Sequence, residues 1–198
     1  HVAVRRQRQM CIRDRDVTIA GIHFQLFHAP GETRDQLFVW LPESKALFCG
    51  DNIYKTFPNL YTIRGTAYRD VNLWKNSLDK MRFKRPELLI PSHTTPIEDA
   101  DSIYNTLTIY RDAIQFIHDQ TVRNMNKGKT PNEIVEKVIL PDHLKNSEWL
   151  QEFYGKTQWS VRTIFDGYLG FFDGNPSTLL PLQSVSYTHL TLPTNSNV

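Results

Sequence analysis

The fold of this chain is decided by residues 28–51, which read HAPGETRDQLFVWLPESKALFCGD. The near-continuous apolar run 36–41 predicts a buried strand, and the turn residues 42–45 predict a hairpin into a second apolar strand. Two acidic residues flank this hairpin, because Glu32 precedes its first strand and Asp51 directly follows its second. The pattern therefore predicts a rigid hairpin with a carboxylate beside each end.

A third strand end carries a histidine. The apolar run 87–91 predicts a buried strand that leads to His93. Taken singly, Glu32, Asp51 and His93 each have an ordinary structural interpretation, as a solvated turn carboxylate or as a side chain that caps a turn. Together they are oxygen and nitrogen donors at strand ends that can meet at one rim of a sheet. Because such donors suit zinc, we favour a site at which the metal activates water.

The surrounding pattern predicts an α/β arrangement followed by helices. Two short strands are expected at 17–20 and 22–27, and a helix at 69–83 separates the hairpin from the strand at 87–91. A strand, helix, strand succession favours an α/β layer arrangement. In the second half the pattern predicts helices at 98–127, 131–140 and 160–168.

Three motifs give the chain a resemblance to the metallo-β-lactamase superfamily. Residues 30–33, 47–51 and 90–93 look like the third, fourth and fifth metal motifs of that superfamily. Most members have His where this chain has Glu32, and a Glu there is a mark of the alkyl sulfatases, dinuclear zinc enzymes that hydrolyse alkyl sulfate esters. Two further runs are similar to sulfatase segments, so that the resemblance covers roughly residues 16–182; these runs are 59–65 and 172–176.

The resemblance implies a fold and a set of roles. The expected fold is a partial metallo-β-lactamase αββα sandwich at 16–97, followed by an α-helical alkyl sulfatase dimerisation-like domain at 98–182. Glu32 would complete the ligand set of one zinc ion, and His93 would bind the second. Asp51 would bridge both ions and so hold the attacking hydroxide, although these sulfatases more often have Glu at this position.

The loop 54–66 is the expected substrate-binding segment. Arg64 is the candidate for holding the sulfate group, because a planar guanidinium can make two parallel hydrogen bonds to an oxyanion. The alternative for Arg64 is an ordinary surface cation. Thr62 and Asn59 could add neutral hydrogen-bond donors to the same group.

The chain also departs from the sulfatase pattern. Trp159 stands where the better-known sulfatases have His, and Phe171 where they often have a more polar aromatic residue, which favours a substrate other than a simple linear alkyl sulfate. The signature cluster His-x-His-x-Asp-His, which supplies most of the zinc ligands, does not occur. Three ligands cannot fill two tetrahedral sites. We therefore expect an inactive fragment, the C-terminal part of a catalytic domain with part of a dimerisation domain, in which one sheet face is open.

Both ends of the chain have an unusual composition. Residues 1–15 hold a local charge of +4 and residues 184–198 hold no charged side chain, so that 16–183 carries −2 of the formal net charge of +2. A basic arm could bind nucleic acid or a membrane surface. However, 1–15 and 183–198 resemble translated sequencing adapters, and we expect both to be non-native. We therefore expect no nucleic-acid partner.

Composition limits the kind of protein further. A chain of 198 residues can form one domain or one and a half, and no apolar run approaches the roughly 18 residues of a membrane span. We expect a soluble homodimer without a membrane span that acts on a small sulfate ester. Without residues 1–15, Cys49 is the only cysteine, so the sequence predicts no compartment. Two alternatives remain, another hydrolase of the same superfamily acting on thioesters, lactones or phosphoesters, and a non-catalytic relative that dimerises through the helix at 98–125.

Overall fold

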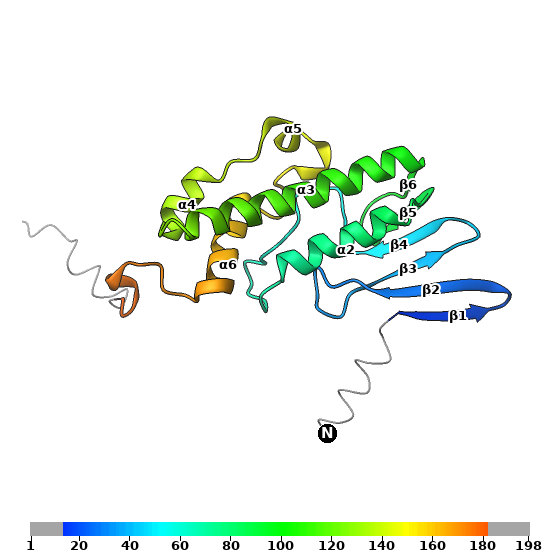
Figure 1. Cartoon of the computed structure of the whole chain (residues 1–198), viewed down its shortest axis with the longest axis horizontal. Coiled ribbons are helices and arrows are strands. Elements are labelled where there is room, and N and C mark those ends of the chain that lie inside the picture. The colour runs from blue at the N-terminus through cyan, green and yellow to red at the C-terminus, as the bar shows by residue number, and fades with distance from the viewer. Residues whose placement is uncertain (1–13, 182–198) are drawn as a thin grey trace, which may run out of the picture.

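The computed structural model describes residues 14–181, so the expected foreign segment 183–198 and nearly all of 1–15 lie outside the described residues. The chain has a sheet half and a helical half (Figure 1). Its strands are β1 (Arg15–Ile19), β2 (Ile22–His28), β3 (Leu37–Leu41), β4 (Ala46–Gly50), β5 (Leu88–Pro91) and β6 (Ile97–Glu98). Its helices are α2 (Val71–Phe83), α3 (Ala100–Met125), α4 (Pro131–Lys137), α5 (Asp142–Lys145) and α6 (Thr157–Leu169), with the 3-10 turns η1 (Glu148–Leu150) and η2 (Pro176–Thr178).

The six strands form one mixed sheet in the order β1-β2-β3-β4-β5-β6. Neighbouring strands are antiparallel, except that β4 and β5 are parallel. Helix α2 makes the connection from β4 to β5, because parallel strands need a crossover. The α/β class expected from the sequence is confirmed. Strands β2, β4 and β5 run in the same direction, so their carboxyl ends lie at one edge of the sheet.

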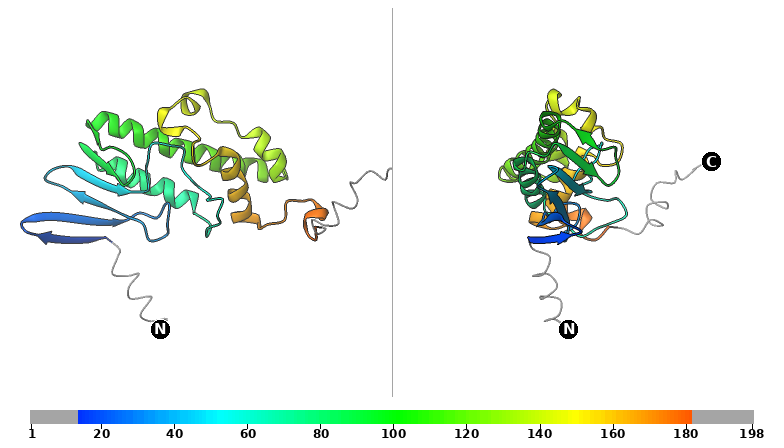
Figure 2. Two further views of the ribbon diagram at one scale, coloured as in Figure 1. Left: turned by 180° about the vertical axis from the view of Figure 1, so that it is seen from behind. Right: turned by 90° about the vertical axis from the view of Figure 1, so that its right-hand side faces the viewer.

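One face of this sheet is packed under helices (Figure 2). Phe38, Leu47 and Leu89 are completely buried on it. They share one hydrophobic core with Trp74 and Leu78 of α2. The alternation of buried and exposed side chains along β3 and β4 places every second residue on this covered face.

The opposite face of the sheet keeps exposed apolar side chains. Phe48 is 40% exposed although it stands between the buried Leu47 and Cys49. Ile22 on β2 and Ile19 on β1, which pair with each other, are 49% and 59% exposed. This is the open sheet face that the sequence predicts.

Helix α3 connects the two halves of the molecule. It packs against α2, β5 and β6 in the sheet half, and against α4, α6 and η1 in the helical half. Its buried stripe includes Ile103, Leu107, Tyr110 and Ile114, which recur every three or four residues as the sequence pattern predicts. Within residues 14–181, no helix combines the length and the apolar character that crossing a membrane requires.

Capping side chains set the helix ends. Thr130 and Glu133 form a capping box at the start of α4. Helix α2 begins at Val71 and not at residue 69, because the Asp70 side chain accepts a hydrogen bond from the Leu73 N–H at 3.0 Å and so caps the helix. Arg69 therefore precedes the helix, where its side chain is free to turn toward the sheet.

Candidate metal centre

The three predicted metal ligands follow three strands that run in the same direction. Glu32 lies four residues after the end of β2, Asp51 directly follows β4, and His93 follows β5 by two residues. The structure therefore places all three at one edge of the sheet, as the sequence analysis expected. Carboxyl ends of strands are where α/β sheets collect ligands.

Asp51 contacts His93 and lies near Glu32. Its Oδ1 atom is 2.5 Å from Nδ1 of His93, whose imidazole is 71% exposed. Burial raises the pKa of Glu32, the nearby Arg69 guanidinium opposes this, and the carboxylate of Asp51 raises the pKa further. The Asp51 carboxylate is thus close enough to disfavour the charged form of Glu32, and a cation between the two carboxylates would relieve that repulsion.

A tight turn brings Glu32 to this edge. The backbone N–H of Glu32 donates to Oδ1 of Asn52 at 3.3 Å, and Nδ2 of Asn52 donates to the carbonyl of Ala29 at 2.7 Å. A Cβ atom on Gly31 would lie 2.0 Å from Asn52 Oδ1 and 3.0 Å from Trp74 Cδ1. Only glycine therefore fits between the turn and α2, which explains the Pro-Gly-Glu sequence.

Arg69 is a site residue that the sequence analysis missed. Its side chain is 6% exposed, and Nη2 lies 3.1 Å from Oε1 of Glu32. Nη1 donates to the carbonyl of Asn59, 10 residues away in the sequence. One buried guanidinium thus contacts both the candidate metal ligand and the candidate substrate loop.

The three predicted substrate-binding residues lie in the irregular segment after β4, but they differ in exposure. Asn59 and Thr62 are buried, and the Thr62 hydroxyl donates to the Gly65 carbonyl at 3.2 Å. Oδ1 of Asn59 is buried with no hydrogen-bond partner among the described residues. Arg64 is exposed and forms no ion pair within residues 14–181. Its guanidinium is therefore accessible to an anion.

A hollow of about 540 Å³ lies beside Glu32. The turn at 28–34 forms one wall, and residues 66–70 form the other together with Leu73. Arg69 and Tyr68 both line it. The candidate centre is therefore next to a cavity large enough for a small organic substrate.

The donor set fits one part of a metal site. Two carboxylates and an imidazole are ligands that zinc accepts. Within residues 14–181, however, no group of three His, Cys, Asp or Glu side chains is already arranged to hold an ion. Asp51 contacts His93, and Glu32 contacts Arg69 instead of the other two candidate ligands. Three ligands are in any case too few to complete a dinuclear centre.

Comparison with known families agrees with this arrangement. The metallo-beta-lactamase superfamily matches residues 12–93, which include strands β1 to β5, helix α2 and all three candidate ligands. The family described as alkyl sulfatase dimerisation matches residues 130–192, which include α4 and α6. The two matches follow the division between the sheet half and the helical half.

Several curated proteins are similar over most of the chain. A linear primary-alkylsulfatase of Pseudomonas is 44% identical over 169 residues, which are 84% of this chain and 32% of that protein. An alkyl/aryl-sulfatase of Saccharomyces cerevisiae is 33% identical, over 86% of this chain and 27% of that protein. The chain thus spans about a third of the length of the curated relatives it matches.

Solved structures of alkylsulfatases are also similar to this chain. A stereoselective inverting sec-alkylsulfatase from Pseudomonas sp. superimposes with a TM-score of 0.83 at 29% identity, over 89% of this chain and 29% of that one. A metallo-beta-lactamase family protein from Thermus thermophilus, at 18% identity and a TM-score of 0.51, shares the fold. The chain therefore belongs to the metallo-β-lactamase superfamily and is alkyl sulfatase-like.

Proposed function

We propose that the full-length protein containing this chain is a dinuclear zinc hydrolase of alkyl sulfate esters. The observation that carries this proposal is that Glu32, Asp51 and His93 follow three parallel-running strands at one edge of the sheet, with His93 in contact with Asp51. The 44% identity to a linear primary-alkylsulfatase supports the choice of sulfate esters among the substrates of the superfamily. The organisation that fits is a catalytic part at 16–97 and a dimerisation-like part at 98–182.

In this proposal each ligand has a separate task. Glu32 and His93 would each belong to one ion, and Asp51, which contacts His93 and lies near Glu32, would be shared. When bound, zinc lowers the pKa of coordinated water toward neutrality, so that hydroxide is available as a nucleophile. Glu32 is only half-buried and lines the hollow beside it, so this side of the centre is accessible to a substrate.

The sulfate group would be held by the loop after Asp51. Arg64 is exposed, and its planar guanidinium can pair with two sulfate oxygens. Asn59 and Thr62 supply polar groups on the buried side of the same loop. The loop thus offers a charged group toward solvent and neutral groups toward the core.

The decisive test is an assay of the purified full-length protein on two substrate classes. We expect release of inorganic sulfate from a medium-chain alkyl sulfate, with little cleavage of a thioester. Chelation should abolish the release and zinc should restore it. Thioester cleavage without sulfate release would instead favour another hydrolase of the superfamily.

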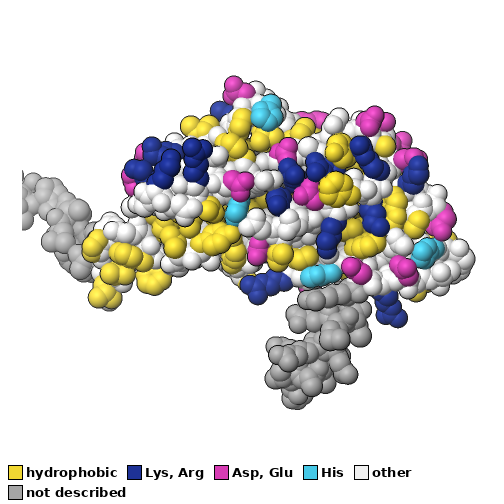
Figure 3. All heavy atoms as spheres, in the orientation of Figure 1, with side chains coloured by type: hydrophobic (Ala, Val, Ile, Leu, Met, Phe, Trp, Pro, Cys, Tyr) yellow, Lys and Arg dark blue, Asp and Glu magenta, His cyan; other side chains and the backbone are white. Residues whose placement is uncertain are grey.

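A homodimer is the proposed assembly. Hydrophobic side chains gather over the segment that follows α6 (Figure 3), and Phe171 and Leu180 are 76% and 90% exposed there. This segment lies within the match to the alkyl sulfatase dimerisation family. Sedimentation of the full-length protein at micromolar concentration should give twice the monomer mass.

A further inference from the structure

The loop 54–66, called the substrate loop below, is irregular in backbone but held on two sides. It contains no helix or strand, yet Phe57 and Leu60 are buried in the core. Tyr54 accepts a hydrogen bond from the Asn59 N–H at 2.7 Å through its hydroxyl oxygen. Burial raises the pKa of Tyr54 to about 12, so this hydroxyl stays neutral in the physiological range. A loop that only joined two elements would not need such fixation.

The first support comes from the helical half. The carbonyl of Gln151 accepts two hydrogen bonds from the substrate loop, from the Phe57 N–H at 2.9 Å and from the Thr56 hydroxyl at 2.7 Å. Gly155 makes the closest approach, since a Cβ atom there would lie 2.6 Å from the Pro58 carbonyl oxygen and 3.0 Å from Asn59 Cα. The contacted atoms belong to backbone, so they cannot move aside as a side chain would.

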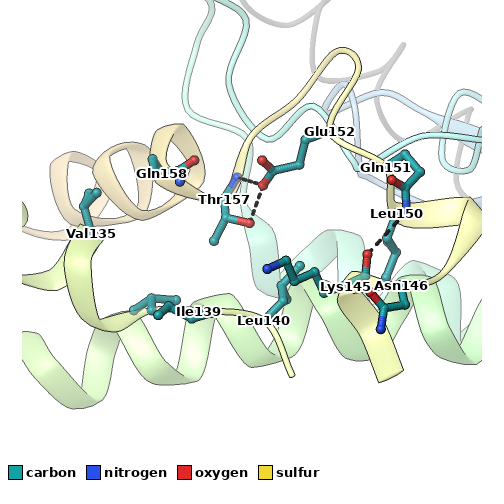
Figure 4. A pocket seen from close by; sticks show the side chains of 11 residues that line it. Val135, Ile139, Leu140, Lys145, Asn146, Leu150, Gln151, Glu152, Thr157 and Gln158 are labelled. Carbon is teal, nitrogen blue, oxygen red and sulfur yellow. Dashed lines mark hydrogen bonds between the residues drawn. The ribbon is translucent and has the colours of Figure 1, made fainter. Parts of the chain in front are cut away.

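The supporting segment is itself fixed (Figure 4). Nε2 of Gln151 donates to the carbonyls of Lys145 and Ser147, at 3.3 and 2.8 Å. The carboxylate of Glu152 accepts hydrogen bonds from both the N–H and the hydroxyl of Thr157, at 2.8 and 2.7 Å. The segment 151–155 is thus tied to α5 on one side and to α6 on the other, and it can serve as a rigid wall.

The second support is Arg69 in the sheet half. Its guanidinium binds the Asn59 carbonyl and the Glu32 carboxylate together. Asn59 is therefore held through its N–H by Tyr54, through its carbonyl by Arg69 and through its backbone by Gly155. Its side-chain oxygen is buried without a partner among the described residues.

We propose that Arg69 and Gly155 are positioning residues that fix Asn59 and the substrate loop between Glu32 and the helical half. This inference rests on the proposed function, because the loop is a substrate loop only in that proposal. It assigns the helical half a role within the site, in addition to any role in dimerisation. Arg69 orients the metal ligand and the loop together, whereas Gly155 orients the loop alone.

The test of Arg69 uses zinc affinity of the full-length protein, measured by competition with a chelator. Arg69→Met should weaken zinc binding by about 10- to 100-fold, the usual effect of losing an outer partner of a metal ligand. Arg69→Lys keeps the charge but cannot reach both partners, so it should lose less. Arg82→Met is the matched control. Arg82 is a largely covered arginine, 12% exposed, whose guanidinium is paired with Asp79 at 2.9 Å and contacts none of the candidate ligands.

The test of Gly155 measures the KM for an alkyl sulfate instead of zinc affinity. Gly155→Ala should raise the KM for an alkyl sulfate by roughly tenfold or more through displacement of the loop, with zinc affinity unchanged. It should also speed exchange of the amide hydrogens of Phe57, Asn59 and Leu60 in the zinc-free protein. Phe153→Ala, which changes an 83% exposed side chain of the same segment, should do neither.

Two outcomes would overturn the inference. One is a loss of zinc affinity in Arg69→Met no larger than in Arg82→Met. The other is hydrogen exchange at Phe57, Asn59 and Leu60 in Gly155→Ala equal to that in Phe153→Ala. Neither readout needs turnover, so a protein that failed to hydrolyse sulfate esters would refute the proposed function and still decide whether Arg69 and Gly155 fix the loop.

Discussion

Polar side chains have different surroundings in two regions of the molecule, the edge of the sheet that carries the candidate ligands and the helical half. In the helical half, the capping box of Thr130 and Glu133 satisfies its polar groups locally, although the hydroxyls of Tyr110 and Thr121 on α3 are buried without a partner among the described residues. At the sheet edge, His93 is largely exposed, Arg64 has no ion pair among the described residues, and the Asn59 oxygen is buried without a partner there. Groups left in this condition do little for folding and are available for ligands.

This difference predicts that function and stability can be separated by mutation. A change at the sheet edge should alter zinc binding or turnover and leave the free energy of unfolding nearly unchanged. A change in the helical packing should do the reverse. The expected effects below run from the largest to the smallest, and each could contradict this separation.

The largest effect is expected for Asp51→Asn in the full-length protein. If Asp51 is shared between two ions as proposed, its removal should forfeit several kcal/mol of metal-dependent transition-state stabilisation, about 10³-fold in kcat. The midpoint of thermal unfolding without zinc should stay close to that of the parent. Asp101→Asn, at an exposed position of α3, is the control and should leave sulfate release unchanged. A large loss of zinc-free stability in Asp51→Asn would contradict the separation.

The opposite behaviour is expected for Leu107→Ala. Leu107 is completely buried on α3, so its truncation should lower the free energy of unfolding by about 2–5 kcal/mol. Urea unfolding measures the loss. Zinc affinity of the folded fraction should match the parent, and a reduced affinity would mean that α3 packing reaches the candidate centre.

The sequence predicts local elements of this molecule better than it predicts contacts between its two regions. Strand and helix patterns are local, so the hairpin at 37–50, α2 and α3 follow from apolar spacing and turn residues. The strand ends were equally local signals, which is why Glu32, Asp51 and His93 could be named as candidate ligands. These three residues share one edge of the sheet because β2, β4 and β5 run in the same direction. The sequence indicates that direction only indirectly, through the strand, helix, strand succession.

Contacts between segments that are distant in the sequence leave no local pattern of apolar spacing or turn residues. Arg69 was assigned to the first turn of a helix at 69–83, and only the Asp70 cap shows that it precedes the helix and turns toward Glu32. Gly155 lies in a run without apolar period, and its close contact with Pro58 depends on how α3 places the two halves. The short elements β6, α5 and the two 3-10 turns were also missed, because a few residues carry no periodicity.

A moderate effect at the sheet edge is expected for Arg64→Lys. Replacing a planar fork by a single ammonium should lose one of two charge-assisted hydrogen bonds to sulfate, and so raise KM by about tenfold. Lys55→Arg is the control, since Lys55 is engaged with Glu148 at 2.6 Å. Steady-state kinetics on an alkyl sulfate separates the two, and equal effects would remove Arg64 from the site.

A smaller effect on stability is expected for Thr130→Ala. The variant loses the side-chain oxygen that accepts from the Glu133 N–H at 3.4 Å, which should cost about 1 kcal/mol of unfolding free energy. Zinc affinity and KM should not change. Ser44→Ala, in an exposed hairpin turn, serves as the comparison and should be neutral in urea unfolding.

The smallest effect concerns pH and the same capping box. The Lys129 ammonium and the backbone N–H and hydroxyl of Thr130 lower the pKa of Glu133 from 4.5 to about 2. Because the pKa is depressed in the folded state, the resulting stability is present above pH 4.5 and is lost as the pH falls toward 2. Glu133→Gln should therefore flatten the acid limb of the stability curve, whereas Glu136→Gln should not. Urea unfolding across this pH window measures both variants, and the difference should shrink in high salt, because the Lys129 to Glu133 pair at 2.8 Å is partly exposed to solvent.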